Sequence, residues 1–322
     1  MPDAAVAVAH TYGAAGVYRA FVAGLPRMGT AEGQINNGDQ AFRLETLVNV
    51  GSEGLASPLA ATAPIVLCGI DEVCEVPVTV FDRSGDGLQF RMSEDFEAGT
   101  LGTFLQPGPP HSTFPATIDP VTGVYEWDTT LASVAAGSTF YSTQVTVESL
   151  TPAITGTIPV PITGTILITD TIASKVALDF LIGLVAASGT PPEFDPGPIG
   201  TLIETRVGKT LNVVVSASDV DDDQVLTMNG HGLPPGAEIT VRSRSGAIAT
   251  RLKWKPGLDQ VGDYLVTFVV TDSGGRQRFG SVAISVAAKS AKSAKSAKSV
   301  KSTKSLKSAK SAKGRGSAKR GK

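Results

Sequence analysis

The chain repeats one pattern of strands and turns, and the second copy is the clearer of the two. Residues 211–219 alternate apolar and polar side chains and lead into an acidic turn at 219–223. A proline turn and a tryptophan run follow, and then a strand over 264–271 in which every second residue from Tyr264 onward is apolar. A period of two residues is that of a half-buried β-strand. A repeated all-β module favours binding or scaffolding over catalysis.

The first copy of the pattern is looser. It has a turn at 81–86, a proline turn at 107–110, and a strand over 141–149 that alternates in the same way. Trp127 and Trp254 occupy matching places in the two copies. We therefore predict that both indoles are buried in hydrophobic cores, and that the Gly-x-Tyr strand starts form tyrosine corners whose hydroxyls bond to upstream backbone.

These patterns divide the chain into two whole modules, a partial one and a tail. The strands at 16–24 and 40–50 look like the end of a sandwich that lacks its earlier strands, so we expect a truncated chain. Truncation would also explain why no signal peptide is visible. The predicted divisions are a half-sandwich over 1–60, a first module over 62–188, a second module over 191–287 and a tail over 288–322.

The second module carries a resemblance to known families. Its acidic turn, its Gly232-Leu-Pro-Pro-Gly236 turn, its Trp254-Lys-Pro256 run and its Gly262-Asp-Tyr264 strand start resemble dystroglycan-type cadherin-like and immunoglobulin-like domains. The first module departs from the pattern, because Asp128 rather than a Lys-Pro pair follows its tryptophan. The resemblance implies tandem immunoglobulin-like β-sandwiches, an extracellular or cell-surface location, a role in adhesion, and calcium binding in some members.

The N-terminal run His10-Thr-Tyr-Gly-Ala-Ala-Gly16-Val-Tyr18 is similar to the end of a polycystic-kidney-disease-type domain. This similarity implies that the partial module is also an immunoglobulin-like sandwich.

The acidic turn of the second module is a candidate calcium site. Carboxylates crowded on a turn supply the hard oxygen ligands that Ca²⁺ prefers. The resemblance implies Asp219, Asp221 and Asp223 as ligands, with Asp82 and Asp86 as a weaker counterpart in the first module. The alternative is a solvated turn whose carboxylates cap backbone groups.

The two cysteines, Cys68 and Cys74, lie six positions apart across an expected turn. They could face each other in a hairpin as a disulfide, or remain as two free thiols. A zinc site is not supported, because no second Cys/His pair lies nearby. The three histidines do not belong to any hydrolase or metalloprotease motif, and no phosphate-binding glycine loop is present. We therefore expect no enzymatic activity.

The tail and the rest of the chain carry opposite charges. Residues 289–322 hold 13 of the 28 Lys and Arg residues and none of the 30 Asp and Glu residues. Residues 1–288 therefore carry a net charge of −15. Low hydrophobicity with unopposed charge predicts disorder, and such a polycation binds polyanions by releasing counterions. The candidate polyanion-binding residues recur at every third position: Lys289, Lys292, Lys295, Lys298, Lys301, Lys304, Lys307, Lys310 and Lys313.

Several polyanions fit the tail. The spacing from Lys289 to Lys301 resembles the pentalysine clusters of silaffin-type proteins, which implies an association with biosilica. An anionic wall polysaccharide, nucleic acid and the acidic body of the same protein are alternatives. No aromatic residue is interleaved with the lysines, so we do not expect sequence-specific reading of nucleic acid.

The leading hypothesis is a non-catalytic extracellular or cell-surface adhesion or scaffold protein, whose tail anchors it to an anionic matrix of polysaccharide or silica. A protein partner in adhesion is also expected from the resemblance. Two alternatives stay open. One is a polyanion-binding protein dominated by its tail, and the other is a glycan-binding accessory module.

Overall fold

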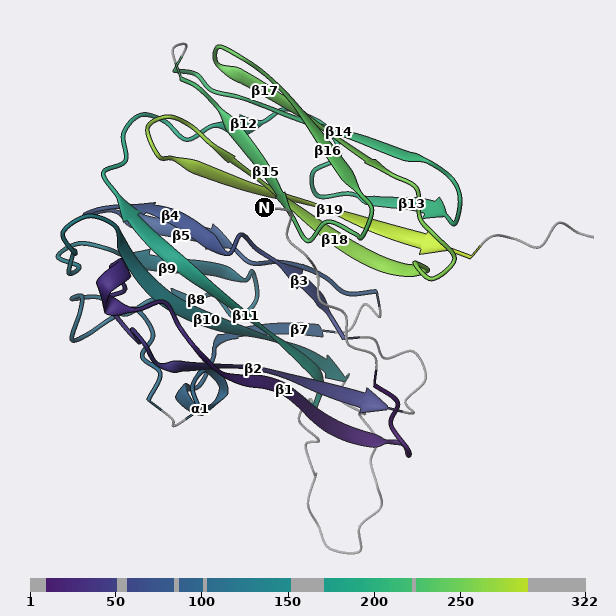
Figure 1. Ribbon diagram of the computed structural model, residues 1–322, viewed down its shortest axis with the longest axis horizontal. Helices are drawn as coiled ribbons and strands as arrows, with labels where there is room; N and C mark the ends of the chain where they lie inside the picture. The colour runs from purple at the N-terminus through teal and green to yellow at the C-terminus, as the bar shows by residue number, and fades with distance from the viewer. Residues whose placement is uncertain are drawn as a thin grey trace, which may run out of the picture. The chain divides into compact units, whose positions relative to one another are not determined.

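The computed structural model describes residues 10–50, 57–83, 87–100, 103–151, 171–221 and 224–288 (Figure 1). The described residues between 10 and 288 belong to one compact unit. The regular secondary structure of the described residues is almost entirely β-strand, arranged as two sandwiches with N-terminal strands added to the first. In the part of the chain that the structure describes, no helix is both long and apolar enough to cross a membrane.

The second sandwich has two four-stranded sheets that enclose one core. Strand β13 (Leu202–Arg206) pairs with β19 (Gln277–Ala287) in parallel, and the other neighbours are antiparallel. This is the arrangement of an immunoglobulin-like sandwich, in agreement with the predicted fold class. One sheet has the order β12 (Glu193–Phe194), β14 (Leu211–Ser218), β17 (Ala247–Trp254) and β16 (Glu238–Arg244). The other has the order β13 (Leu202–Arg206), β19 (Gln277–Ala287), β18 (Gly262–Thr271) and β15 (Thr227–His231).

The first sandwich repeats this plan. One of its sheets has the order β5 (Val73–Pro77), β9 (Val124–Asp128) and β8 (Thr117–Ile118). The other contains β11 (Thr171–Val185), β10 (Thr139–Thr151) and β7 (Gly87–Met92), with β4 (Ile65–Gly69) parallel to β11. Short strands β3 (Leu59–Ala61) and β6 (Thr79–Phe81) pair with each other. The apolar stretch that begins at Val176 forms the later part of β11.

Each core is built around its tryptophan, as predicted. Trp127 and Trp254 are at most 1% exposed. Trp127 packs edge-on against Tyr141 with ring centroids 4.7 Å apart, and Trp254 packs in the same way against Tyr264 at 4.9 Å. The Tyr141 hydroxyl donates to the backbone oxygen of Ser133 at 2.9 Å. A tyrosine corner is therefore present in the first sandwich.

The two N-terminal strands belong to the sheet of the first sandwich, whereas the sequence predicts a half-sandwich of their own. Strand β1 (Gly16–Pro26) pairs along its length with β2 (Ala41–Val50). Strand β2 meets β11 where Leu47 lies opposite Lys175. Strand β4 covers β11 only from Leu181 onward, so the first half of that edge is open to β2. Between β1 and β2 lies the short 3₁₀ turn η1 (Thr30–Glu32).

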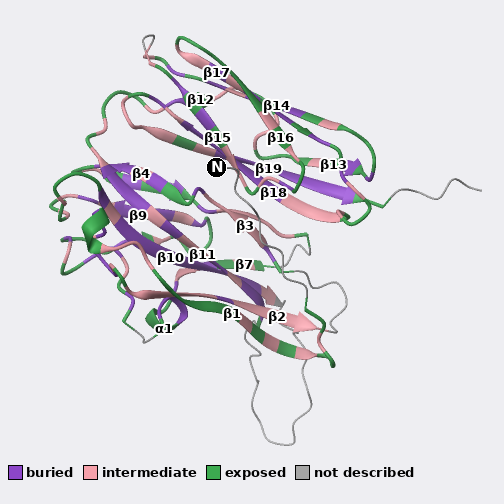
Figure 2. Ribbon diagram, viewed as in Figure 1, coloured by how far each residue is buried: buried purple, intermediate pink, exposed green. Residues whose placement is uncertain are grey.

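The outward face of β10 is polar but buried. Ser142, Gln144, Thr146 and Glu148 alternate with the core residues of this strand, and each is at most 4% exposed. Figure 2 shows both β10 and β11 buried along most of their length. The covering groups come from the β1–β2 connection, from Arg43 on β2, and from Ser93, which precedes helix α1 (Asp95–Ala98). For example, Asn36 Oδ1 accepts a hydrogen bond from the Ser142 amide at 2.7 Å. Burial of this polar face is tolerated because most of its groups find hydrogen-bond partners, although Oε1 of Gln144 has none among the described residues.

Charged side chains connect α1 and β2 to this face. Arg91 on β7 makes two hydrogen bonds to Glu97 on α1, at 2.7 and 2.9 Å, and one to Glu148 at 2.8 Å. The Lys175 ammonium lies 2.8 Å from Glu45 and 2.5 Å from Glu97. We call these five residues the charged layer. It fixes the N-terminal strands and α1 to the first sandwich.

The two sandwiches contact each other through the outward face of β18. Val269 on this face is 3% exposed and belongs to the core cluster of the first sandwich. The Thr267 hydroxyl donates to the Ala61 backbone oxygen at 3.1 Å, and Arg83 pairs with Asp263 at 2.9 Å. Both faces of β18 are therefore buried, because one packs in its own core and the other packs on the neighbouring sandwich.

Candidate functional site

Two buried aspartates meet where strands of the second sandwich end. Asp219 directly follows β14, and Asp272 directly follows β18. Their exposed fractions are 9% and 6%. The Asp219 amide donates to the Gly246 oxygen at 2.9 Å, and the Asp272 amide donates to the Arg276 oxygen at 3.1 Å. The strand ends thus hold both carboxylates inside the turn region.

In each of these carboxylates, one oxygen accepts a hydrogen bond and the other has no hydrogen-bond partner among the described residues. Oδ1 of Asp219 accepts from the Asp221 amide at 2.9 Å, and Oδ1 of Asp272 accepts from the Arg276 amide at 2.8 Å. Neither Oδ2 atom has a hydrogen-bond partner among the described residues. Burial raises the pKa of Asp272, the negative charge of Asp219 raises it further, and the bond from Arg276 acts in the opposite direction. Two buried carboxylates that influence each other electrostatically, each with a free oxygen, fit either a bound cation or a bound proton.

The structure distributes the predicted calcium ligands differently from the sequence expectation. Asp221 turns toward the linker, where its Oδ2 accepts from the Thr190 amide at 2.8 Å. Asp82 lies in the first sandwich, and its Oδ2 accepts from the Ser149 hydroxyl at 3.5 Å. Asp223 and Asp86 lie outside the described residues. Within the described ranges, no three His, Cys, Asp or Glu side chains gather as a metal-binding group.

Sequence reasoning missed Asp272 as the neighbour of Asp219. A signal was present, because an aspartate follows the late strand at Thr271-Asp272 just as one follows β14 at Ser218-Asp219. Both strands run into the same end of the sandwich, but the sequence alone does not show that two strands from different sheets end side by side.

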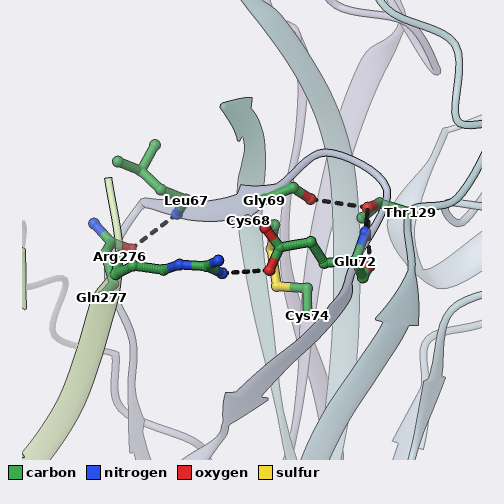
Figure 3. The surroundings of a disulfide bond; sticks show 8 residues. All are labelled: Leu67, Cys68, Gly69, Glu72, Cys74, Thr129, Arg276 and Gln277. Carbon is green, nitrogen blue, oxygen red and sulfur yellow. Dashed lines mark hydrogen bonds and ion pairs between the residues drawn. A yellow bond between two sulfur atoms is a disulfide. The ribbon is translucent and has the colours of Figure 1, made fainter. Parts of the chain in front are cut away.

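Cys68 on β4 and Cys74 on β5 are joined by a disulfide, with their Cα atoms 5.5 Å apart. The turn between them is held by Thr129, whose hydroxyl donates to the Gly69 oxygen at 2.8 Å. In this turn Glu72 forms an ion pair with Arg276 of the second sandwich (Figure 3). The disulfide hairpin is therefore also a contact between the two sandwiches.

A second such contact lies beside the disulfide. The Leu67 amide donates to Oε1 of Gln277 at 2.8 Å (Figure 3). Gln277 begins β19, next to Arg276 in the chain. The hairpin therefore contacts neighbouring residues of the second sandwich through both its strand and its turn.

The nine tail lysines predicted to bind polyanions, Lys289 to Lys313, all lie outside the described residues. Their proposed role therefore rests on charge and spacing in the sequence.

No protein-family model matches the sequence. No curated protein matches it either.

Solved structures match at low similarity. The GspB Siglec domain shares 19% identity at a TM-score of 0.26, over 32% of this chain and 60% of its own length. An endo-fucoidan hydrolase of glycoside hydrolase family 107 shares 15% identity at 0.24, over 86% of this chain and 35% of its own. Titin immunoglobulin tandem domains share 12% identity at 0.24, over 72% of this chain and 97% of their own. The chain thus spans less than two thirds of the first two structures, and the fold rests on the strand order described above.

Proposed function

We propose that this chain is a non-catalytic extracellular or cell-surface scaffold that attaches to an anionic partner. The observation that carries the proposal is the disulfide between Cys68 and Cys74, placed where the two sandwiches meet. Disulfides persist in oxidising compartments and are rare in the cytosol. A two-sandwich body with a buried contact and a cross-linked hairpin suits a rigid unit outside the cell.

The charge division supplies the means of attachment. A tail with 13 cations follows a body whose net charge is −15. Such a tail would bind an anionic polysaccharide or silica by counterion release, to which the net negative charge of the body contributes nothing. The general attachment to the matrix is therefore proposed to run through the tail.

Retention of the full chain on sulfated and on unmodified polysaccharide beads tests this attachment. We expect retention on the sulfated beads at about 0.15 M salt and release at about 1 M, because counterion release falls steeply with salt. Retention that is equal on both matrices, or that survives high salt, would count against the proposal. Stronger retention on DNA-cellulose than on the sulfated beads would favour the tail-dominated nucleic-acid alternative.

We also propose that Ca²⁺ binds at Asp219 and Asp272. The support is their two orphaned buried oxygens, since a buried carboxylate oxygen without a donor is costly unless a cation or proton satisfies it. Asp222 and Asp223 follow Asp221 directly in the sequence. Calcium would tie the end of β14 to the end of β18 across the two sheets. Titration calorimetry with Ca²⁺ that gave no heat would remove this part of the proposal.

A further inference from the structure

The basic residues of the body fall into two groups with different surroundings. Eight of them form ion pairs in the first sandwich, at the contact between sandwiches or near the linker: Arg19, Arg27, Arg43, Arg83, Arg91, Lys175, Arg276 and Arg278. The remaining seven have no ion pair among the described residues, and all belong to the second sandwich. They are Arg206, Lys209, Arg242, Arg244, Arg251, Lys253 and Lys255.

Four of these unpaired cations lie on one face of one sheet. In the register of β16 and β17, Arg242 lies opposite Ala249, and Arg244 lies opposite Ala247. The buried residues Ile248, Leu252 and Trp254 alternate with the outward positions of β17. Arg251 and Lys253 therefore point outward together with Arg242 and Arg244, and all four are exposed. We call this surface the basic face. It is exceptional in a body whose net charge is −15.

Small residues make a hollow in this face. Ala247 and Ala249 lie between the arginines of β16 on one side and Ser218 and Ser216 of β14 on the other. A pocket of about 300 Å³ opens there, lined by Arg242, Arg244, Ala247, Ala249, Ser216 and Asp195 among others. This volume is at the lower end of the range for small-ligand sites. The two alanines leave this space open, because a longer side chain at either position would fill it.

The polar groups around the hollow differ from one wall to the other. The β16 wall offers two guanidinium groups, whose planar forks bind carboxylate or sulfate with two parallel hydrogen bonds. The opposite wall holds Asp195, which accepts a hydrogen bond from the Ser218 hydroxyl at 3.0 Å, together with Ser216. A carboxylate there disfavours a ligand that is anionic throughout. It favours one that carries anionic groups on one side and hydroxyl donors on the other.

A second pocket extends the surface along the same two strands. It has about 310 Å³ and is lined by Glu238, Lys253 and Lys255, among others. Glu238 and Lys253 are direct partners in the β16–β17 register, at the end of these strands remote from Arg244. Arg251 lies between the two pockets. A linear ligand could therefore contact cations along the whole length of the strand pair.

We propose that the basic face binds an acidic saccharide, a chain of sugar units that bear sulfate or carboxylate groups. The anionic groups would lie against Arg242, Arg244 and Arg251, and the ring hydroxyls would donate to Asp195. This site deepens the proposed function by placing a specific contact with the anionic partner on the folded body, but it does not depend on the tail. A bare polyphosphate or an acidic peptide would leave the Asp195 wall opposed to an anion.

The test is an NMR titration of the full-length ¹⁵N-labelled chain with a sulfated tetrasaccharide prepared from heparin. We expect saturable shifts at the Ala247, Ala249 and Ser216 amides. The double variant Arg242→Ser/Arg244→Ser should weaken binding at least tenfold, since each charge-assisted hydrogen bond lost costs about that factor or more. The matched control Arg206→Ser/Lys209→Ser removes the same charge from exposed, unpaired positions on or beside the other sheet. It should leave the affinity unchanged.

Three outcomes would overturn the inference. One is the absence of shifts on β16 and β17, the second is an equal loss of affinity in both double variants, and the third is equal affinity for a glutamate-rich peptide. A neutral cellotetraose should cause no shifts.

Shifts confined to the Lys/Ser repeat would refute the site on the sheet but leave the proposed attachment through the tail intact. Shifts in neither place would contradict both. Unchanged chemical shifts of the core amides in each variant show that the variant is folded.

Discussion

Glu72 and Arg276 form an ion pair that joins the disulfide hairpin of the first sandwich to the start of β19 in the second. The hairpin turn has little freedom, because Thr129 bonds its backbone and the Cys68–Cys74 disulfide closes it. Glu72 is thereby presented to the second sandwich in a fixed position. The disulfide thus supports both a local hairpin and a contact between sandwiches.

Replacing both cysteines with serine should destabilise the body. In the chain-entropy description, a disulfide that closes so short a loop contributes about 2 kcal/mol. We expect the free energy of unfolding in urea to fall by about that amount. Adding reductant to the wild-type chain should reproduce the loss, while the serine variant should not respond to reductant. A wild-type chain as stable in reductant as without it would contradict the expectation.

Lys175 should be among the most sensitive residues of the charged layer. Its ammonium lies between Glu45 and Glu97, and all three residues are buried. Lys175→Met removes the cation but leaves both carboxylates in place, which costs about 3–5 kcal/mol in buried ion pairs. Lys255→Met, at an exposed position, should change stability by less than about 0.5 kcal/mol. Chemical denaturation of the two variants distinguishes them, and a similar small effect in both would show that the layer is not stabilising.

The charged layer should also determine the pH range in which the fold loses stability on acidification. Burial alone would raise the pKa of Glu97, but hydrogen bonds from Arg91 and Lys175 outweigh it and lower the pKa to about 2. The pKa of Glu45 is lowered in the same way against its burial, by Lys175 and Arg43. A lowered folded-state pKa contributes stability that is present above the unfolded pKa and is lost as the pH falls toward the folded value. We expect the melting temperature to fall between about pH 4.5 and pH 2.

The variant Glu97→Gln provides the check on this pH dependence. It should be less stable at neutral pH and should show a shallower acid transition than the wild type. An acid transition of unchanged slope would assign the pH dependence to other carboxylates.

The variant Asp272→Asn distinguishes between a bound cation and a bound proton at Asp219 and Asp272. The raised pKa of Asp272 means that stability present at low pH is lost as the pH rises through the folded pKa. In EDTA at neutral pH, the variant should therefore be more stable than the wild type, because a buried negative charge beside Asp219 is gone. In Ca²⁺ the order should reverse if a cation bridges the pair.

Differential scanning calorimetry with EDTA and with Ca²⁺ makes this comparison. Asp259→Asn, an exposed position in the same sandwich, serves as the control and should respond to Ca²⁺ as the wild type does. An equal response to Ca²⁺ in the Asp272 variant would place any calcium elsewhere.

Much of the fold could be predicted from the sequence, because period-two strands and glycine and proline turns are local signals. The strands around Tyr141 and Tyr264 and the buried positions of Trp127 and Trp254 were of this kind. The attachment of β1 and β2 was not, since it depends on β4 leaving half of one edge of β11 open. The burial of Gln144 was also hidden, because an alternating polar face looks the same whether solvent or a polar layer covers it.

The candidate sites were harder to predict than the fold. The acidic turn was visible as a run of aspartates, but the neighbour of Asp219 comes from a strand more than fifty residues later. The basic face was hidden for a related reason. Arg242 and Arg251 belong to different strands, and only the register of β16 with β17 places them on one surface. Long-range pairing, which local sequence does not encode, decides both sites.

The most direct test of the account is the state of the two cysteines in the protein at its natural location. Intact cells would be labelled with a membrane-impermeant biotin reagent, and the labelled protein would be digested without reduction. We predict that the chain is found in the labelled fraction, with Cys68 and Cys74 bonded in one peptide that gains the mass of two hydrogens on reduction. A chain that stays unlabelled inside the cell, with both thiols free to alkylate, would contradict an extracellular scaffold.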